Sequence, residues 1–119
     1  MGWLKTALGG GQGVDAHAAD GLVRTGATLL DVRSTAEWRA GHAPKALHVP
    51  LDELESRLDK LPRDRTVVAV CRAGGRSARA TALLTRNGFD AKNLSGGMRA
   101  WASAGLAVKT DNGRNGTIA

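Results

Sequence analysis

The sequence predicts an α/β fold in which helices cover both faces of a parallel sheet. Short apolar segments such as "ATLLDV" and "TVVAV" are bounded by turn residues, as buried strands are. The segments between them repeat leucine or alanine every three or four residues, as helices that pack on a sheet do. A chain of 119 residues is long enough for one domain of this kind.

The elements of the first part of the chain follow from their end signals. A helix is expected over residues 16–25, because Asp15 is a suitable N-cap and Gly26 a suitable stop. The apolar strand follows at residues 27–32. The segment "STAE" has the pattern of a capping box, which predicts a short helix over residues 35–40.

The second part of the chain contains the most strand-like run, "TVVAV" at residues 66–70, which should form a central strand. Before it, leucines spaced three and four residues apart predict a helix over residues 52–61. The other expected elements are a brief strand at 47–49, a helix from its cap Ser77 to about residue 87, a strand at 91–94 and a helix at 98–103.

Glycine and polar residues at the two ends predict flexible segments. Residues 1–13 hold five glycines and residues 109–119 are polar, with several Gly and Asn. We therefore expect an N-terminal arm at 1–13, a single domain at 14–108 and a C-terminal tail at 109–119.

The net charge of +6 raises the question of nucleic-acid binding. Between residues 71 and 101 there are six cationic side chains and one anionic side chain, with Phe89 and Trp101 as the only aromatic residues. Surfaces that bind single-stranded nucleic acid place several aromatic side chains among the basic ones, so that the bases can stack on them. This segment therefore better fits a small anionic substrate. We expect neither a nucleic acid nor a membrane as partner, because no apolar run has the length of a membrane span.

The chain has one cysteine, Cys71, so it forms no intramolecular disulfide, and this fits a reducing, cytoplasmic location. The cysteine and three histidines lack metal-ligand spacing, and no metal or cofactor is expected. No signal peptide is recognisable.

Cys71 lies at the expected carboxyl end of the central strand, immediately before a helix, where α/β sheets bind ligands. The helix N-terminus should lower the pKa of a thiol there and favour the reactive thiolate. Gly74 and Gly75 let the backbone curl into an anion-binding nest, and Arg72 and Arg76 add cationic donors. A buried, inert cysteine would need none of these residues.

Three motifs carry a family resemblance. The segment "CRAGGRS" resembles the active-site loop of the rhodanese (thiosulfate sulfurtransferase) homology domain. The segments "LLDVRSTAEWRAGHAPKALHVP" and "LSGGMRAW" resemble two further signatures of that family, and all three occur in the family's order. The resemblance covers about residues 14–106. It implies a three-layer α/β/α domain around a mostly parallel sheet of about five strands.

The resemblance also implies a two-step sulfur relay. The Cys71 thiolate would take sulfur from thiosulfate, release sulfite and pass the sulfur from its persulfide to cyanide or a thiol. Arg76, assisted by Arg72, would hold the sulfonate. The main-chain N–H groups that would bind the persulfide belong to Arg72, Ala73, Gly74, Gly75, Arg76 and Ser77.

Other functions remain open at this point. Cysteine phosphatases use Cys-x5-Arg, whereas Cys71 and Arg76 give the shorter Cys-x4-Arg, which crowds a phosphate and disfavours a phosphatase or arsenate reductase. A non-catalytic module that binds a partner is disfavoured because Cys71 is present. A persulfide carrier loaded or unloaded by a partner protein cannot be separated from a thiosulfate enzyme by sequence. A monomer or weak homodimer is expected.

Four more residues receive structural interpretations. Asp31 and Arg33 lie at the end of a neighbouring strand, and one of them is expected to brace the active loop by pairing with an arginine. His42 is expected to lock its own loop by a hydrogen bond. Lys45 stands where the family commonly has Gly, a departure that would strain a left-handed backbone.

Overall fold

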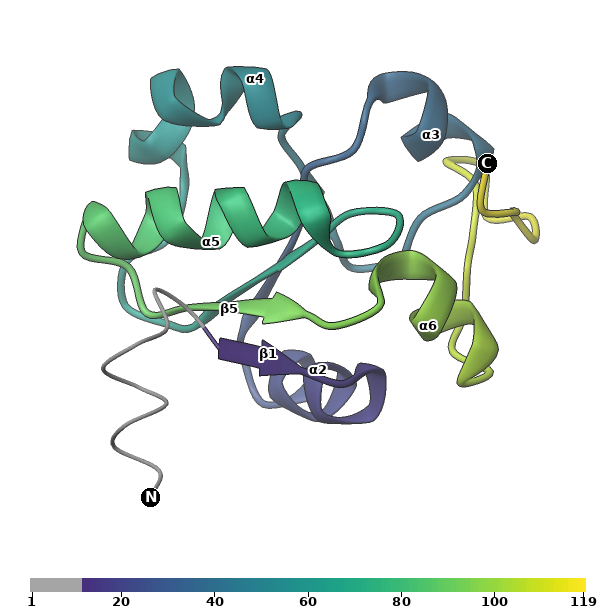
Figure 1. Ribbon diagram of the computed structural model, residues 1–119. Helices are drawn as coiled ribbons and strands as arrows, with labels where there is room; N and C mark the ends of the chain where they lie inside the picture. The colour runs from purple at the N-terminus through teal and green to yellow at the C-terminus, as the bar shows by residue number, and fades with distance from the viewer. Residues whose placement is uncertain (1–11) are drawn as a thin grey trace.

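A computed structural model describes residues 12–119, so most of the expected N-terminal arm lies outside the described residues. Its last two residues, Gln12 and Gly13, belong to a strand instead. The five strands are all parallel, in the spatial order β1-β5-β4-β2-β3 (Figure 1). Their bounds are β1 Gln12–Val14, β2 Thr28–Asp31, β3 Leu47–His48, β4 Val67–Val70 and β5 Ala91–Leu94.

Helices cover both faces of this sheet, as predicted (Figure 1). One face carries α4 (Leu51–Leu54), the 3-10 helix η1 (Glu55–Lys60) and α5 (Gly75–Arg86). The other carries α2 (Ala16–Arg24) and α6 (Gly97–Ser103). The short helix α3 (Thr35–Ala40) lies beyond the end of β2. The layers confirm the expected three-layer α/β/α arrangement.

The central strand β4 explains how one segment supports two cores. Its side chains alternate between the faces, so Val67 and Ala69 join the cluster under α5 while Val68 and Val70 join the cluster under α2 and α6. All four residues are fully buried, as a strand covered on both faces must be.

The local end signals account for most helix boundaries. The Asp15 carboxylate accepts a hydrogen bond from the Ala18 N–H, and Ser34 and Glu37 form the complete capping box. The leucine pattern predicted the buried face of the segment at 52–61 but not its helix type, because α4 gives way to η1. Ser77 does not cap α5: the helix begins two residues earlier, at Gly75, after Gly74.

The C-terminal segment, expected to be flexible, contacts the domain at several points. Lys109 pairs through its backbone with His42 and with Asn115. The Thr117 N–H donates to the Ala40 carbonyl at 2.9 Å, beside α3. Composition did not anticipate these contacts, because most are made by the backbone, and Ile118 is the one apolar side chain of residues 109–119 that packs against the core. Within residues 12–119, no helix is long and apolar enough to cross a membrane.

Candidate active site

Cys71 is the first residue after β4, at the carboxyl edge of the sheet and at the entry to α5. Its side chain is buried, with 1% of its surface exposed. The loop turns sharply at Gly74, whose φ of +121° lies in the region that favours glycine. This turn directs the N–H of Gly74 toward the Cys71 Sγ, at 3.1 Å.

Burial raises the pKa of the Cys71 thiol, but hydrogen bonds to its sulfur outweigh burial and bring the pKa below its ordinary value. They come from the Ser77 hydroxyl and from the N–H groups of Ser77, Gly74 and Ala73. The loop therefore favours the thiolate, which is the nucleophilic form of cysteine.

Gly96 and Gly97, which follow β5, allow the start of α6 to contact this loop. The Met98 N–H donates to the Cys71 carbonyl at 2.8 Å, and the Arg99 N–H donates to the Arg72 carbonyl at 3.2 Å. A Cβ on Gly97 would lie 2.4 Å from both carbonyl oxygens. The family resemblance of "LSGG" does not reveal this role, although two adjacent glycines after a strand indicate close backbone approach.

Ser77 lies inside the first turns of α5 and is fully buried. Its Oγ is 3.3 Å from the Cys71 Sγ, 3.2 Å from the Gly74 carbonyl oxygen and 2.6 Å from Oδ1 of Asn93 on β5. Asn93, which the sequence analysis did not single out, also donates from Nδ2 to the Gly74 carbonyl at 3.3 Å. Ser77 thus connects the thiol to the neighbouring strand.

Arg76 does not turn its terminal nitrogens toward the sulfur. Its Nη1 and Nη2 donate to the two carboxylate oxygens of Glu37 on α3, at 2.7 and 2.8 Å. These hydrogen bonds from Arg76 lower the pKa of Glu37 to about 2, against a smaller opposing effect of burial, with help from Ser34. The sequence predicts only the capping-box role of Glu37, because its partner Arg76 is distant in the chain.

The other loop residues are more exposed. Ala73 and Gly75 are exposed, and so is Arg72, whose Nε donates to a main-chain oxygen of Ala119 at 2.9 Å. Of the two arginines expected at the site, only Arg76 forms an ion pair with an Asp or Glu side chain of residues 12–119.

Asp31 and Arg33 pair with each other rather than with a loop arginine. Both side chains are fully buried, and Arg33 Nη2 lies 2.7 Å from Asp31 Oδ2 and 2.8 Å from the Gly41 carbonyl oxygen. The pair fixes the path of the chain from β2 to α3, so the expected direct brace of the active loop is not formed.

The remaining two interpretations concern the loop after α3. His42 Nδ1 contacts the Trp38 carbonyl at 2.8 Å and its ring stacks on the Trp38 ring, which agrees with a loop-locking role. Lys45 is exposed, and no residue other than glycine has a positive φ within residues 12–119. Lys45 therefore replaces the usual glycine without backbone strain.

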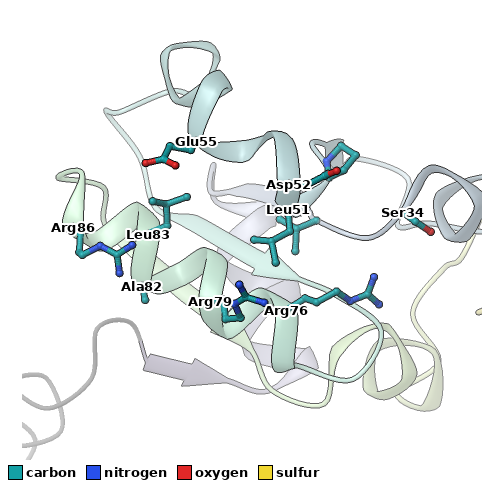
Figure 2. A pocket seen from close by; sticks show the side chains of 11 residues that line it. Ser34, Leu51, Asp52, Glu55, Arg76, Arg79, Ala82, Leu83 and Arg86 are labelled. Carbon is teal, nitrogen blue, oxygen red and sulfur yellow. The ribbon is translucent and has the colours of Figure 1, made fainter.

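A surface groove of about 800 Å³ begins beside the loop and follows α5 (Figure 2). Its α5 wall carries Arg76, Arg79 and Arg86, and its opposite wall carries Asp52 and Glu55. Cys71 does not line this groove, so the groove adjoins the site rather than containing it.

Comparisons with known proteins agree with this geometry. A model of the rhodanese-like domain matches residues 14–104. A sulfurtransferase of Allochromatium vinosum is 41% identical over 86 residues, which cover 71% of this chain and 80% of that protein. Thiosulfate sulfurtransferase 16, a chloroplastic protein of Arabidopsis thaliana, is 34% identical over 109 residues, which cover 81% of this chain and 91% of that protein.

Among solved structures, a rhodanese-related protein of Thermoplasma volcanium is 28% identical with a TM-score of 0.77, and the match covers 82% of this chain and 96% of that chain. The family model spans most of the chain, and the other two motifs contact the Cys71 loop, through Glu37 on Arg76 and through the Met98 N–H on the Cys71 carbonyl. The chain belongs to the rhodanese-like domain family.

Proposed function

We propose that the protein transfers sulfane sulfur from thiosulfate to a thiol or cyanide through a persulfide on Cys71. The observation that carries the proposal is the Cys71 sulfur itself, which receives the Gly74 N–H at 3.1 Å at the start of α5. Kinship with proteins named sulfurtransferases supports sulfur transfer as the class of reaction. The donor, the acceptor and the intermediate are the parts that we propose.

In the first step, the Cys71 thiolate attacks the outer sulfur of thiosulfate. A bond forms between the two sulfurs, the sulfur–sulfur bond of thiosulfate breaks, and sulfite leaves with its electron pair. In the second step, cyanide or a thiolate attacks the outer sulfur of the persulfide and Cys71 leaves as the thiolate. The hydrogen bonds that lower the Cys71 pKa raise its thiolate fraction, and the proposed steps use no separate general base. A thiol that must remain reduced fits a cytoplasmic protein.

The anion-binding groups divide into two kinds. The loop N–H groups face the transferred sulfur, as they already face Sγ. Arg72 is the direct sulfonate donor in this proposal, because the terminal nitrogens of Arg76 are held by Glu37. Arg76 adds positive charge near Cys71 and binds the sulfonate directly when it leaves Glu37.

The test is intact-mass measurement after mixing the protein with thiosulfate. We expect a gain of about 32 Da, one sulfur atom, that disappears when cyanide is added. Cys71→Ser should show no gain, and since Cys71 is the only cysteine, any persulfide in the parent protein lies there. Arg86→Ala, at the far end of the groove from the loop, is the control for lost surface charge and should load normally.

A phosphatase is the competing outcome. If the protein hydrolyses an aryl phosphate and gains no mass from thiosulfate, the sulfur-transfer proposal is wrong. The short Cys-x4-Arg loop argues against that outcome, because the Gly74 N–H already touches Sγ and leaves little room for a phosphoryl group.

The groove beside the loop favours a second candidate, a persulfide carrier whose acceptor is a protein. A groove of about 800 Å³ exceeds what cyanide requires and is within the range of pockets that hold larger ligands. Leu83→Trp, which fills the groove, should slow sulfur transfer to a reduced protein thiol more than to cyanide. If Leu83→Trp slows transfer to the protein thiol and to cyanide equally, the groove does not bind a protein acceptor and this second candidate is wrong.

A further inference from the structure

The Ser77 hydroxyl has one proton and several acceptors within reach. Asn93 Oδ1 is 2.6 Å from the Ser77 Oγ, and the Cys71 Sγ is 3.3 Å from it. The Gly74 carbonyl oxygen, at 3.2 Å, already accepts from the Ala78 N–H and from Asn93 Nδ2, which occupy its two lone pairs. The Ser77 proton is therefore shared between the amide oxygen and the sulfur.

The orientation of the Asn93 amide follows from its other partner. The Gly74 carbonyl can only accept, so the NH₂ group must face it and Oδ1 must face Ser77. A flipped amide would place Oδ1 against the Gly74 carbonyl, two acceptors in contact. Asn93 is thus held as an acceptor for the Ser77 proton.

We propose that Asn93 is a positioning residue that tunes the Cys71 nucleophile by competing with its sulfur for the single proton of Ser77. In the thiol form, the Cys71 S–H donates to the Ser77 oxygen and the Ser77 O–H donates to Asn93 Oδ1. When the thiol loses its proton to solvent, the Ser77 O–H can reach the thiolate only by leaving Asn93. Asn93 therefore opposes ionisation, while the loop N–H groups promote it.

The comparison of variants leaves unchanged the charged groups of the neighbouring elements. Arg72 lies in the loop, and Arg76, in the first turn of α5, pairs with Glu37 on α3. Asp31, the last residue of β2, pairs with Arg33. Lys92 and Arg99 lie on β5 and α6. Their effects on the thiol are common to all variants and cancel when variants are compared with the parent protein.

The test is a pH titration of the thiolate ultraviolet absorbance of the resting 119-residue chain. Because Cys71 is the only cysteine, the signal belongs to it alone, and the method requires no reagent to reach a buried sulfur. Asn93→Leu removes the competing acceptor and should lower the Cys71 pKa by about 0.5 to 1 unit. Asn93→Asp, whose carboxylate is a stronger acceptor and carries negative charge, should raise the Cys71 pKa.

Opposite shifts from two substitutions of similar size separate this role from a structural one, since damage to the loop would shift both variants in the same direction. In a Ser77→Ala background, the effect of Asn93→Leu should vanish, because Asn93 acts through Ser77. Asn87→Leu, an exposed asparagine at the other end of α5, is the matched control and should leave the pKa unchanged. Asn93→Ala replaces Asn93→Leu if the leucine variant does not fold.

A shift in the same direction for the leucine and aspartate variants, or a leucine effect that persists without Ser77, would overturn the proposal. Its meaning for catalysis rests on the proposed function, but the titration contains no sulfur donor. Failure to load sulfur and failure of the predicted pKa shifts are therefore separate results.

Discussion

The chain segments that follow β2 and β4 leave the same edge of the sheet, but their polar groups have different partners. After β2, Asp31 and Arg33 neutralise each other in the interior, and Arg33 also binds the Gly41 carbonyl. After β4, the backbone turns its N–H groups toward the sulfur of Cys71. The first segment pairs its two charges with each other and fixes the path of the chain, and among residues 12–119 only Arg33 Nη1 stays buried there without a hydrogen-bond partner. The second keeps donors directed at a reactive atom.

The two arginine–carboxylate pairs near this edge differ in how far their side chains are exposed to solvent. Asp31 and Arg33 have no exposed side-chain surface, whereas Arg76 and Glu37 are 39% and 17% exposed. A buried pair that loses one member leaves a charge in a medium of low dielectric constant, while an exposed pair exchanges its partner for water. The buried pair should therefore control stability, and the exposed pair should control substrate binding.

The largest expected effect comes from breaking the buried pair. Asp31→Ala leaves the Arg33 guanidinium buried without its counter-charge and should lower the free energy of unfolding by about 3–5 kcal/mol. This is a large part of the roughly 5–15 kcal/mol that stabilises a domain. Urea unfolding followed by circular dichroism measures the loss.

The control replaces both members of that pair with apolar residues. Asp31→Leu with Arg33→Met removes the charge as well as its partner and should cost less than Asp31→Ala alone. If the single variant loses under about 1 kcal/mol, the pair does not hold the β2 edge together.

An intermediate effect is expected at the glycine that supports the β4 loop. Gly97→Ala and Gly105→Ala both place a side chain at a positive φ, +62° and +80°, and should share a backbone cost of roughly 1–2 kcal/mol. Only Gly97→Ala also drives a Cβ into the carbonyls of Cys71 and Arg72, whereas the space around Gly105 is empty. Gly97→Ala should therefore lose more stability and also load less sulfur from thiosulfate. Equal behaviour of the two variants in both assays would show that Gly97 does not support the loop.

The sequence predicted the parts of this comparison that depend on local patterns. The parallel sheet, the caps at Asp15 and Ser34, and a cysteine at the end of a central strand all follow from neighbouring residues. The family resemblance, rather than periodicity, supplied the expected sulfur chemistry.

Contacts between distant segments could not be predicted in this way. Glu37 and Arg76 are 39 residues apart, and the capping box gave Glu37 a sufficient local role that concealed its second one. Ser77 and Asn93 meet only because β5 lies beside β4 in the sheet. Ser77 was mistaken for a cap because it is a good capping residue, but the glycines before it allow α5 to begin earlier.

The smallest expected effect tests the exposed pair. Glu37→Gln keeps an acceptor for the Ser34 N–H but removes the charge that holds Arg76, so stability should change by about 0–1 kcal/mol. The released guanidinium should lower the KM for thiosulfate about fivefold, equal to about 1 kcal/mol, while Arg76→Ala should raise it.

Arg76 lowers the pKa of Glu37 to about 2, so the pair is intact above about pH 4.5 and breaks only as pH falls toward 2. The KM ratio of the parent protein to Glu37→Gln should therefore be constant from about pH 5 to about pH 8. If Glu37→Gln raises the KM as Arg76→Ala does, the pair serves to position the loop and Arg76 is not a sulfonate donor.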